Sequence, residues 1–140
     1  MSPRQITADF AVAPQIAVSE IPNLHAAGFR SIICNRPDGE DSGQPPYAAI
    51  EAAAKAAGME ARHLPVRPGQ MTASDVDTMR SLIDSLPKPV LAYCRSGARS
   101  TALWQAAQQA ASPSSSSAQS TDVGLGGLLR KGIGLVTGKR

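Results

Sequence analysis

Apolar segments rich in strand-forming residues alternate along this chain with segments of helical pattern, and this alternation restricts the fold more than any other feature. The strand candidates lie near residues 10–12, 29–34, 60–66 and 89–94. The helix candidates span about 18–27, 46–57, from just after 72 or 74 to about 86, and 98–111. Strands that alternate with helices form parallel sheets covered by helices, so we expect an α/β fold with a mostly parallel sheet of about four to five strands.

Capping residues give the expected helix ends. Ser19 is a candidate N-cap for the first helix, and Gly28 is placed to stop it. Gly58 follows the second, Ala-rich helix, and Pro87 ends the third.

The composition changes at residue 112, which predicts three parts. We expect one domain over 1–111, a Ser-rich linker over 112–122 and a disordered, basic, Gly-rich tail over 123–140. The tail carries four basic residues and no acid, and the whole chain has a net charge of +3, so the remainder carries −1. We therefore expect no nucleic-acid binding, although the tail has the character for weak contact with an anionic membrane surface or a partner groove.

The chain contains two cysteines, Cys34 and Cys94, a number that favours reduced thiols in the cytoplasm over a disulfide framework. The first ten residues lack the apolar core of a signal peptide, and no stretch of about 18 apolar residues is present. We expect neither a leader nor a transmembrane segment. The two histidines, His25 and His63, are too few for a dinuclear metal site, so neither a metal nor a cofactor is expected.

The stretch LAYCRSGARSTALW (91–104) passes from an apolar strand into a helical pattern through the loop C-R-S-G-A-R at 94–99. The carboxyl ends of strands in open α/β sheets face the ligand crevice, and the next helix begins with unpaired N–H groups and a positive dipole end. Gly97 permits a tight turn that aims successive amides at one point. The loop therefore predicts an anion site in which Cys94 has a lowered pKa and acts as a nucleophile.

Side chains of the same loop have expected roles. Arg99 is placed to reach over the amides as a bidentate clamp for an oxyanion. Ser100 is a candidate to hydrogen-bond the sulfur, and Arg95 is expected to point to solvent and to raise the local positive potential. The alternative, a buried core cysteine at 94, does not explain the R-S-G-x-R-S that follows it. The other expected members of the anion-binding loop are Ser96, Gly97 and Ala98.

The motif C-R-S-G-A-R-S resembles the active loops of dual-specificity protein phosphatases, Cys-x5-Arg, and of single-domain rhodanese sulfurtransferases, C-R-x-G-x-R-S. Together, GFRSIICNRPDGED (28–41), AAKAAGMEARHLPV (53–66) and PVLAYCRSGARSTALW (89–104) resemble one family: the phosphatase-like domain of bacterial beta-lactamase-hydrolase-like proteins, also labelled sulfur transferase. The resemblance covers roughly residues 3 to 110 and implies a dual-specificity-phosphatase-like fold. Members fused to a metallo-beta-lactamase-like domain suggest work on sulfide or persulfides.

The chain departs from the phosphatase pattern in two ways. Four residues separate Cys94 from Arg99, one fewer than in Cys-x5-Arg, and the shorter loop suits a persulfide sulfur better than a tetrahedral phosphate. The loop where related phosphatases carry a general acid reads R-P-G-Q (67–70), without an acid. Asp75 and Asp77 follow at the start of a predicted helix, where acids commonly stabilise the helix dipole.

The loop N-R-P-D-G-E-D (35–41) leaves a strand on the same side of the sheet. Asp38 or Glu40 is a candidate proton donor, and Arg36 and Glu40 are candidate substrate contacts. An ordinary surface turn explains P-D-G equally well. Cys34 is a candidate resolving thiol for an oxidised or persulfidated Cys94, with a small buried strand residue as the alternative.

Three functions remain open from the sequence. The leading prediction is a Cys-dependent, phosphatase-like hydrolase with Cys94 as nucleophile, Arg99 as clamp and Asp38 as acid. The alternatives are a sulfurtransferase with a persulfide on Cys94 and a module that binds an anionic or phosphorylated ligand without turnover. Each takes a small anionic substrate, either a phosphoester or a sulfur donor, and none predicts an oligomeric state.

Overall fold

The computed structural model describes residues 3–111. The chain divides into two units, Met1–Ala107 and Gln108–Arg140, and the fold is that of the first. The predicted linker over 112–122 and the predicted tail over 123–140 lie outside the described residues. Among residues 3–111, no helix is both long enough and apolar enough to cross a membrane.

One five-stranded sheet forms the centre of the fold, in the order β1-β2-β5-β3-β4. The central pairings β2–β5, β5–β3 and β3–β4 are parallel, which confirms the predicted sheet. The strand β1 pairs antiparallel with β2 at one edge and was not among the strand candidates. The strands are β1 (Arg4–Thr7), β2 (Phe10–Ala13), β3 (Ser31–Cys34), β4 (Glu60–His63) and β5 (Val90–Tyr93).

The helices occupy the predicted segments, although the first is split. A 3₁₀ turn, η1 (Val18–Glu20), precedes α1, which begins at Ile21 with Pro22 in its first turn, where a proline costs no hydrogen bond. The prediction of Ser19 as N-cap is therefore wrong, because Ser19 lies inside η1. The helices are α1 (Ile21–Ala26), α2 (Tyr47–Ala56), α3 (Ala73–Ser85) and α4 (Ala98–Ala111).

Local signals set the helix ends as expected. Gly28 and Gly58 have φ angles of 108° and 82°, a left-handed conformation that glycine adopts without strain after a helix. A capping box starts α3: the Thr72 hydroxyl accepts from the Asp75 amide at 3.1 Å, and the Asp75 carboxylate accepts from the Thr72 amide at 3.0 Å. Asp75 therefore has a structural role, as its position at a helix start suggested.

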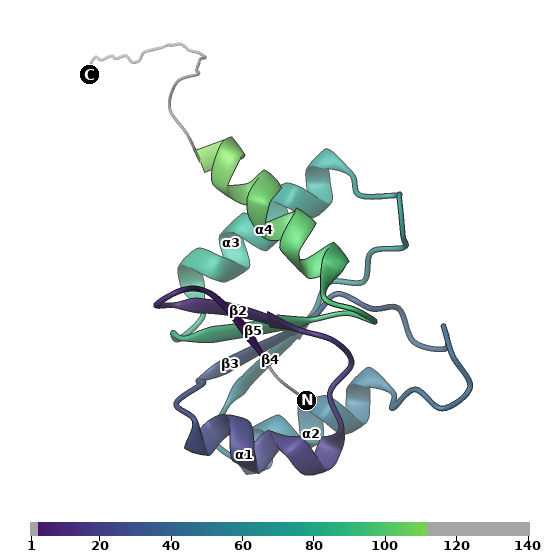
Figure 1. The fold of residues 1–140 in the computed structure, drawn as a ribbon, viewed down its shortest axis with the longest axis vertical. Coiled ribbons are helices and arrows are strands. Elements are labelled where there is room, and N and C mark those ends of the chain that lie inside the picture. Colours follow the sequence, from purple (N-terminus) through teal and green to yellow (C-terminus); the bar gives the residue numbers. More distant parts are fainter. Residues whose placement is uncertain (1–2, 112–140) are drawn as a thin grey trace. The chain divides into compact units, whose positions relative to one another are not determined.

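Helices α1 and α2 cover one face of the sheet, and α3 and α4 cover the other (Figure 1). Successive strand residues alternate between the two cores, as the pleat requires. Ile32 and Leu91 pack under α1 and α2, whereas Ile33 and Val90 pack under α3 and α4. All four side chains are at most 1% exposed, so the central strands are buried on both faces.

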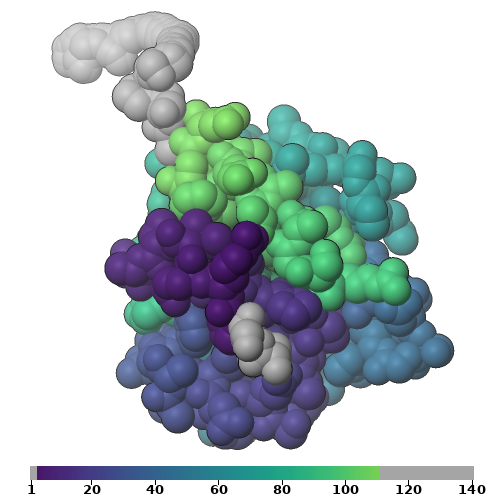
Figure 2. Space-filling view, viewed as in Figure 1, coloured from purple at the N-terminus to yellow at the C-terminus, as the bar shows by residue number. Residues whose placement is uncertain are grey.

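The N-terminal hairpin lies against α4, as Figure 2 shows for the purple and green segments. Arg4 Nη2 donates to Thr101 Oγ1 at 2.9 Å, and Phe10 stacks on Trp104 with ring centroids 5.9 Å apart. Trp104 thus packs against the core. These contacts hold α4, and the loop that precedes it, against the sheet.

We expect the substitution Ile32→Ala to destabilise the fold strongly. Ile32 is 0% exposed on the middle of a central strand, so truncation leaves a cavity and lowers the free energy of unfolding by about 2–5 kcal/mol. Urea denaturation followed by circular dichroism measures the change. As the control, Val18→Ala alters a side chain that is 40% exposed and costs less than about 1 kcal/mol. Equal losses in the two variants would contradict the described core.

Candidate active site

The loop after β5 folds around the sulfur of Cys94. Gly97 has a φ angle of 95°, in the left-handed region, and its amide donates to Cys94 Sγ at 3.1 Å. A Cβ atom at this position would lie 3.6 Å from the backbone of Ala13, at the end of the neighbouring strand β2. The backbone geometry of residue 97 therefore turns the chain so that the start of α4 faces the thiol.

The main-chain amides around Cys94 lower its pKa. Burial alone would raise the pKa of the Cys94 thiol, but hydrogen bonds from the backbone of Ser100, Ser96, Arg99 and Gly97 outweigh it. The residue is 0% exposed. The loop therefore stabilises a buried thiolate in the manner that the sequence predicts for a nucleophile.

Arg99 is held in a fixed orientation by the loops after β3 and β4. Its Nη1 and Nη2 atoms donate to the two carboxylate oxygens of Glu40 at 2.8 and 2.9 Å, and Nη1 also donates to Val66 O at 2.8 Å. A guanidinium has five N–H donors. The Nε–H and the second Nη2–H have no hydrogen-bond partner among residues 3–111, so that edge of the planar fork remains free for an oxyanion.

Glu40 and Arg36 form the support of Arg99. Arg36 is 2% exposed; its Nε donates to Glu40 at 2.8 Å, its Nη1 donates to Gln15 at 2.9 Å, and its Nη2 pairs with Asp41. Hydrogen bonding to Arg99 lowers the pKa of Glu40 to about 2; burial opposes this shift, and Arg36 reinforces it. Glu40 is thus ionised at neutral pH. Arg36 is buried and joins Glu40 to Gln15 and Asp41.

Two expectations from the sequence are disfavoured by this arrangement. The hydrogen bonds from Arg99 and Arg36 lower the pKa of Glu40 to about 2, which favours the ion pair over a role of Glu40 as proton donor at neutral pH. A guanidinium that is 2% exposed and bonded by three side chains does not reach a substrate, so Arg36 is not a substrate contact in this structure.

Ser100 and Asn35 join the start of α4 to the loops after β3 and β4. The Ser100 hydroxyl donates to Asn35 Oδ1 at 2.8 Å, so it does not bond the sulfur; only the Ser100 amide serves Cys94. Asn35 Nδ2 donates to Leu64 O at 3.1 Å. Ser100 and Asn35 are both 0% exposed. Asn35 was not among the predicted site residues, although its position directly after a predicted strand is a signal for such a role.

The other predicted residues lie around this centre. Asp38 is exposed, and its Oδ1 accepts from the Tyr47 amide at 2.8 Å, at the first residue of α2. Arg95 is exposed as predicted, and its Nε lies 3.4 Å from Asp41 Oδ2. Ser96 Oγ accepts from the Ala98 amide at 3.3 Å within the loop. The roles of Asp38 and Arg95 in catalysis stay predictions.

Cys34 is a buried thiol at the end of β3. Its Sγ donates to Arg36 O at 3.3 Å, and burial raises its pKa, an effect that hydrogen bonds to Tyr93 and Arg36 only partly oppose. The side chain belongs to the core under α1 and α2. A thiol of raised pKa attacks another sulfur slowly at neutral pH, which favours the alternative of a buried strand residue.

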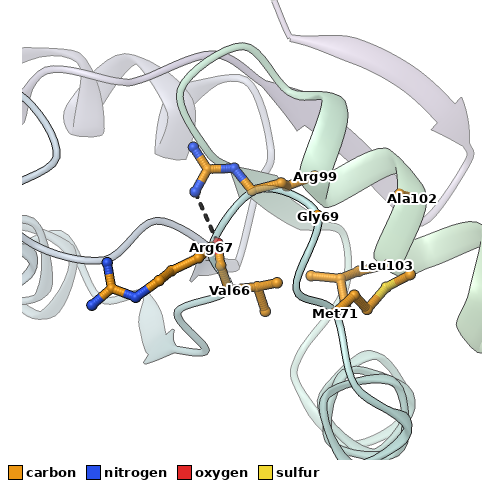
Figure 3. A pocket seen from close by; sticks show the side chains of 7 residues that line it. All are labelled: Val66, Arg67, Gly69, Met71, Arg99, Ala102 and Leu103. Carbon is orange, nitrogen blue, oxygen red and sulfur yellow. Dashed lines mark hydrogen bonds between the residues drawn. The ribbon is translucent and has the colours of Figure 1, made fainter.

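A pocket of about 270 Å³ adjoins Arg99, between the loop after β4 and the first turns of α4 (Figure 3). Val66, Arg67 and Met71 line it on the loop side, and Ala102 and Leu103 on the helix side.

Within residues 3–111, no group of three or more His, Cys, Asp or Glu side chains lies together in a way that could hold a metal ion.

Comparisons with known proteins show which family and which fold this chain resembles. Residues 3–111 match a family model described as the phosphatase-like domain of beta-lactamase hydrolase-like proteins. A beta-lactamase hydrolase-like protein of Agrobacterium fabrum is 38% identical over 93 residues, which cover 66% of this chain and 22% of that relative. The chain thus matches less than a quarter of the length of this curated relative.

Two solved structures show how the fold is shared. A candidate phosphatase from Neisseria meningitidis is 36% identical, with a TM-score of 0.68 and 72% of each chain covered. The active form of Tk-PTP is 18% identical, with a TM-score of 0.54, and the match covers 77% of this chain and 81% of that one. The second likeness, at this low identity, shows the fold alone.

We expect Glu40→Gln to remove an acid-sensitive contribution to stability. A carboxyl whose pKa falls from 4.5 to about 2 on folding stabilises the fold fully above the unfolded pKa, and this contribution is lost as the pH falls through about 2. One pKa unit corresponds to about 1.4 kcal/mol, so the contribution is on the order of 3 kcal/mol. Urea denaturation from pH 7 down to pH 3 measures it.

The stability difference between the parent and Glu40→Gln should be constant above about pH 5.5 and shrink below about pH 4.5. The control is Glu60→Gln, because Glu60 pairs with Arg62 only at the exposed surface. A difference between parent and Glu40→Gln that stays constant down to pH 3 would contradict the assigned ion pair.

Proposed function

This chain belongs to the family of phosphatase-like domains of beta-lactamase hydrolase-like proteins, and from that premise we propose that it is a Cys-dependent hydrolase of small phosphoesters. Cys94 is the proposed nucleophile and Arg99 the proposed oxyanion clamp. The observation that carries the proposal is the Gly97 amide 3.1 Å from the Cys94 sulfur, within a loop that lowers the pKa of this thiol. An inert core cysteine would have a raised pKa.

The proposed reaction has two steps. In the first, the Cys94 thiolate attacks phosphorus, an S–P bond forms, and the ester P–O bond breaks. In the second, water attacks phosphorus, the S–P bond breaks, and phosphate leaves as the thiolate re-forms. The free Nε/Nη2 edge of Arg99 and the loop amides hold the phosphoryl oxygens throughout, which stabilises the charge that develops there.

Few acidic side chains in this site are placed to protonate the oxygen of the leaving group. The loop after β4 contains no acid between Arg67 and Gln70, and Glu40 is ionised. Asp38 stays the proposed donor, as an exposed carboxyl on the loop after β3. Substrates whose leaving group is stable as an anion, such as aryl phosphates, therefore suit this site best.

Access to the sulfur requires an opening of the two loops around it. Cys94 is 0% exposed, and the Arg99–Glu40 and Arg95–Asp41 ion pairs join the loop after β5 to the loop after β3. The second pair lies at the surface, where an ion pair contributes about 1 kcal/mol or less. We propose that this pair separates when the substrate enters.

Sulfur transfer is a second candidate, favoured by the loop length. Four residues, rather than five, separate Cys94 from Arg99. In that reaction the Cys94 thiolate attacks the outer sulfur of thiosulfate, an S–S bond forms, and sulfite leaves with the electron pair of the broken bond. A second thiolate then takes the sulfur from the persulfide.

Intact-mass measurement after mixing with substrate candidates separates these reactions. We expect phenyl phosphate to give a phosphoryl adduct on Cys94 or a steady release of phosphate, and Cys94→Ser to abolish both. Cys34→Ser is the matched control and should retain turnover. A gain of one sulfur from thiosulfate, without any phosphoryl adduct, would replace the hydrolase by the sulfurtransferase. Binding of phosphate without turnover would leave a binding module.

We expect Arg99→Lys to lower kcat by about 10²–10³-fold, because an ammonium group cannot bind Glu40 and an oxyanion through two edges at once. Steady-state hydrolysis of phenyl phosphate measures the loss. Arg80→Lys is the control, with an expected change of less than about threefold, because that side chain pairs only with Asp84 on the exposed surface of α3. An Arg99→Lys variant as active as the parent would exclude the clamp.

A further inference from the structure

Asn35 is a fully buried polar residue that directly follows β3, in the layer where the parallel strands end. Its side chain is bonded at both ends. Oδ1 accepts from the Ser100 hydroxyl at 2.8 Å, and Nδ2 donates to Leu64 O at 3.1 Å. A buried amide whose donor and acceptor are both satisfied is held in one orientation, so Asn35 is a fixed point for the groups that it bonds.

The main chain of Asn35 adds two bonds to this arrangement. Its amide donates to Tyr93 O at 2.8 Å, in the residue before Cys94, and its carbonyl accepts from the Val66 amide at 3.1 Å. Val66 O in turn accepts from Arg99 at 2.8 Å, the bond drawn in Figure 3. Asn35 therefore holds the end of β5, the loop after β4 and the start of α4 in one position relative to each other.

Ser100 is the residue through which Asn35 reaches the thiol. It is the third residue of α4, and the Thr101 amide already bonds Gly97 O at 3.0 Å, so the Ser100 amide is one of the helix-start donors that have no partner inside the helix. Burial raises the pKa of Cys94, and the Ser100 amide gives the largest of the hydrogen bonds that oppose this effect. The direction of that amide depends on where the Ser100 side chain is held.

We propose that Asn35 is a positioning residue for the nucleophile: by holding the Ser100 hydroxyl, it keeps the Ser100 amide directed at the Cys94 sulfur. The inference rests on the proposed function of Cys94 and adds a residue that acts on the thiolate through another. A hydroxyl has one proton to donate. Since that proton is given to Asn35 Oδ1, the Ser100 hydroxyl does not serve the sulfur itself.

The side chain of Asn35 bonds neutral groups, a hydroxyl and a carbonyl, within a site that contains many charges. The charged side chains around the thiol, on its own segment and on the loops after β3 and β4, are Arg95, Arg99, Arg36, Glu40, Asp41 and Arg67. Substitution of Asn35 or Ser100 by alanine alters none of these charges. A change in the ionisation of Cys94 in such variants therefore arises from hydrogen bonding.

The pH dependence of alkylation by iodoacetamide tests the proposal on the full chain. The thiolate is the reacting form, so the rate follows the ionised fraction, and peptide masses separate Cys94 from Cys34. Asn35→Ala should shift the profile to higher pH. On its rising part the rate at a given pH should fall by about tenfold, because a hydrogen bond to an ionised group contributes at least about this factor. The plateau should not fall, since a thiolate of higher pKa is a stronger nucleophile.

Ser100→Ala is the second variant, and it keeps both the main-chain amide and a good helix former at this position. It should shift the profile as Asn35→Ala does. The double variant should shift no further than either single one, because both substitutions remove the same bond. If Asn35→Ala does not fold, the shift in Ser100→Ala decides alone.

Ser31→Ala is the matched control at the opposite end of β3. Ser31 is 0% exposed, and its hydroxyl donates to Pro87 O at 2.7 Å, so the control also loses one buried hydrogen bond. It should lose stability in urea and keep the parent alkylation profile. This comparison separates the positioning of the thiolate from a general loosening of the fold.

A parent profile in Ser100→Ala, additive shifts in the double variant, or the same shift in Ser31→Ala would overturn the proposal. So would a shift to lower pH in Asn35→Ala, which would mean that the freed hydroxyl turns to the sulfur, and so would a parent Cys94 that iodoacetamide does not modify at any pH. Hydrolysis of phenyl phosphate is scored separately: a parent without turnover but with the expected shifts would refute the hydrolase and retain the role of Asn35.

Discussion

The bidentate pair between Arg99 and Glu40 is the interaction on which the rest of the site depends. It joins the loop after β5 to the loop after β3, and the bond from Arg99 to Val66 O adds the loop after β4. Arg36 bonds the same carboxylate from below while 2% exposed. Removal of one member of such a network leaves a buried charge without compensation, which costs far more than an exposed pair contributes.

Strand register explains why these loops meet. β3 and β5 are parallel neighbours in which Cys34 lies opposite Tyr93, so Asn35 and Cys94 leave the sheet side by side. The Asn35 amide donates to Tyr93 O at 2.8 Å and continues the ladder by one residue. Residues that are far apart in the chain are thereby placed in one layer, where the carboxyl ends of parallel strands form a ligand site.

The sequence was sufficient for the parts of the fold that depend on local patterns. The central strands, the four helical segments, the turn at Gly97 and the lowered pKa of Cys94 all follow from residues within about ten positions of each other. The strand β1 could not be predicted in this way, because its sequence RQIT is short and mostly polar, and because it pairs with β2 at the edge of the sheet. The start of α1 at Ile21 is better indicated by Pro22, a residue that favours the first turn of a helix, than by Ser19.

The support of Arg99 could not be read from the sequence, because it depends on a pairing between residues 59 positions apart. Local composition made N-R-P-D-G-E-D equally compatible with a surface turn, and only the tertiary structure shows that Arg36 points inward and Glu40 toward Arg99. The same limit applies to Asn35, whose two side-chain partners, Leu64 and Ser100, lie on the loop after β4 and on α4.

The charge balance of the site indicates what must hold a substrate anion. The carboxylates of the loop after β3 already pair three guanidinium groups, so side-chain charge alone leaves little excess for a phosphate. The remaining attraction comes from the loop amides, the positive end of the 14-residue α4, and the free edge of Arg99. A site of this kind recognises the shape of an oxyanion through directed N–H groups, and long-range attraction contributes less. Discrimination between substrates therefore falls to the group attached to that oxyanion and to the surface it contacts.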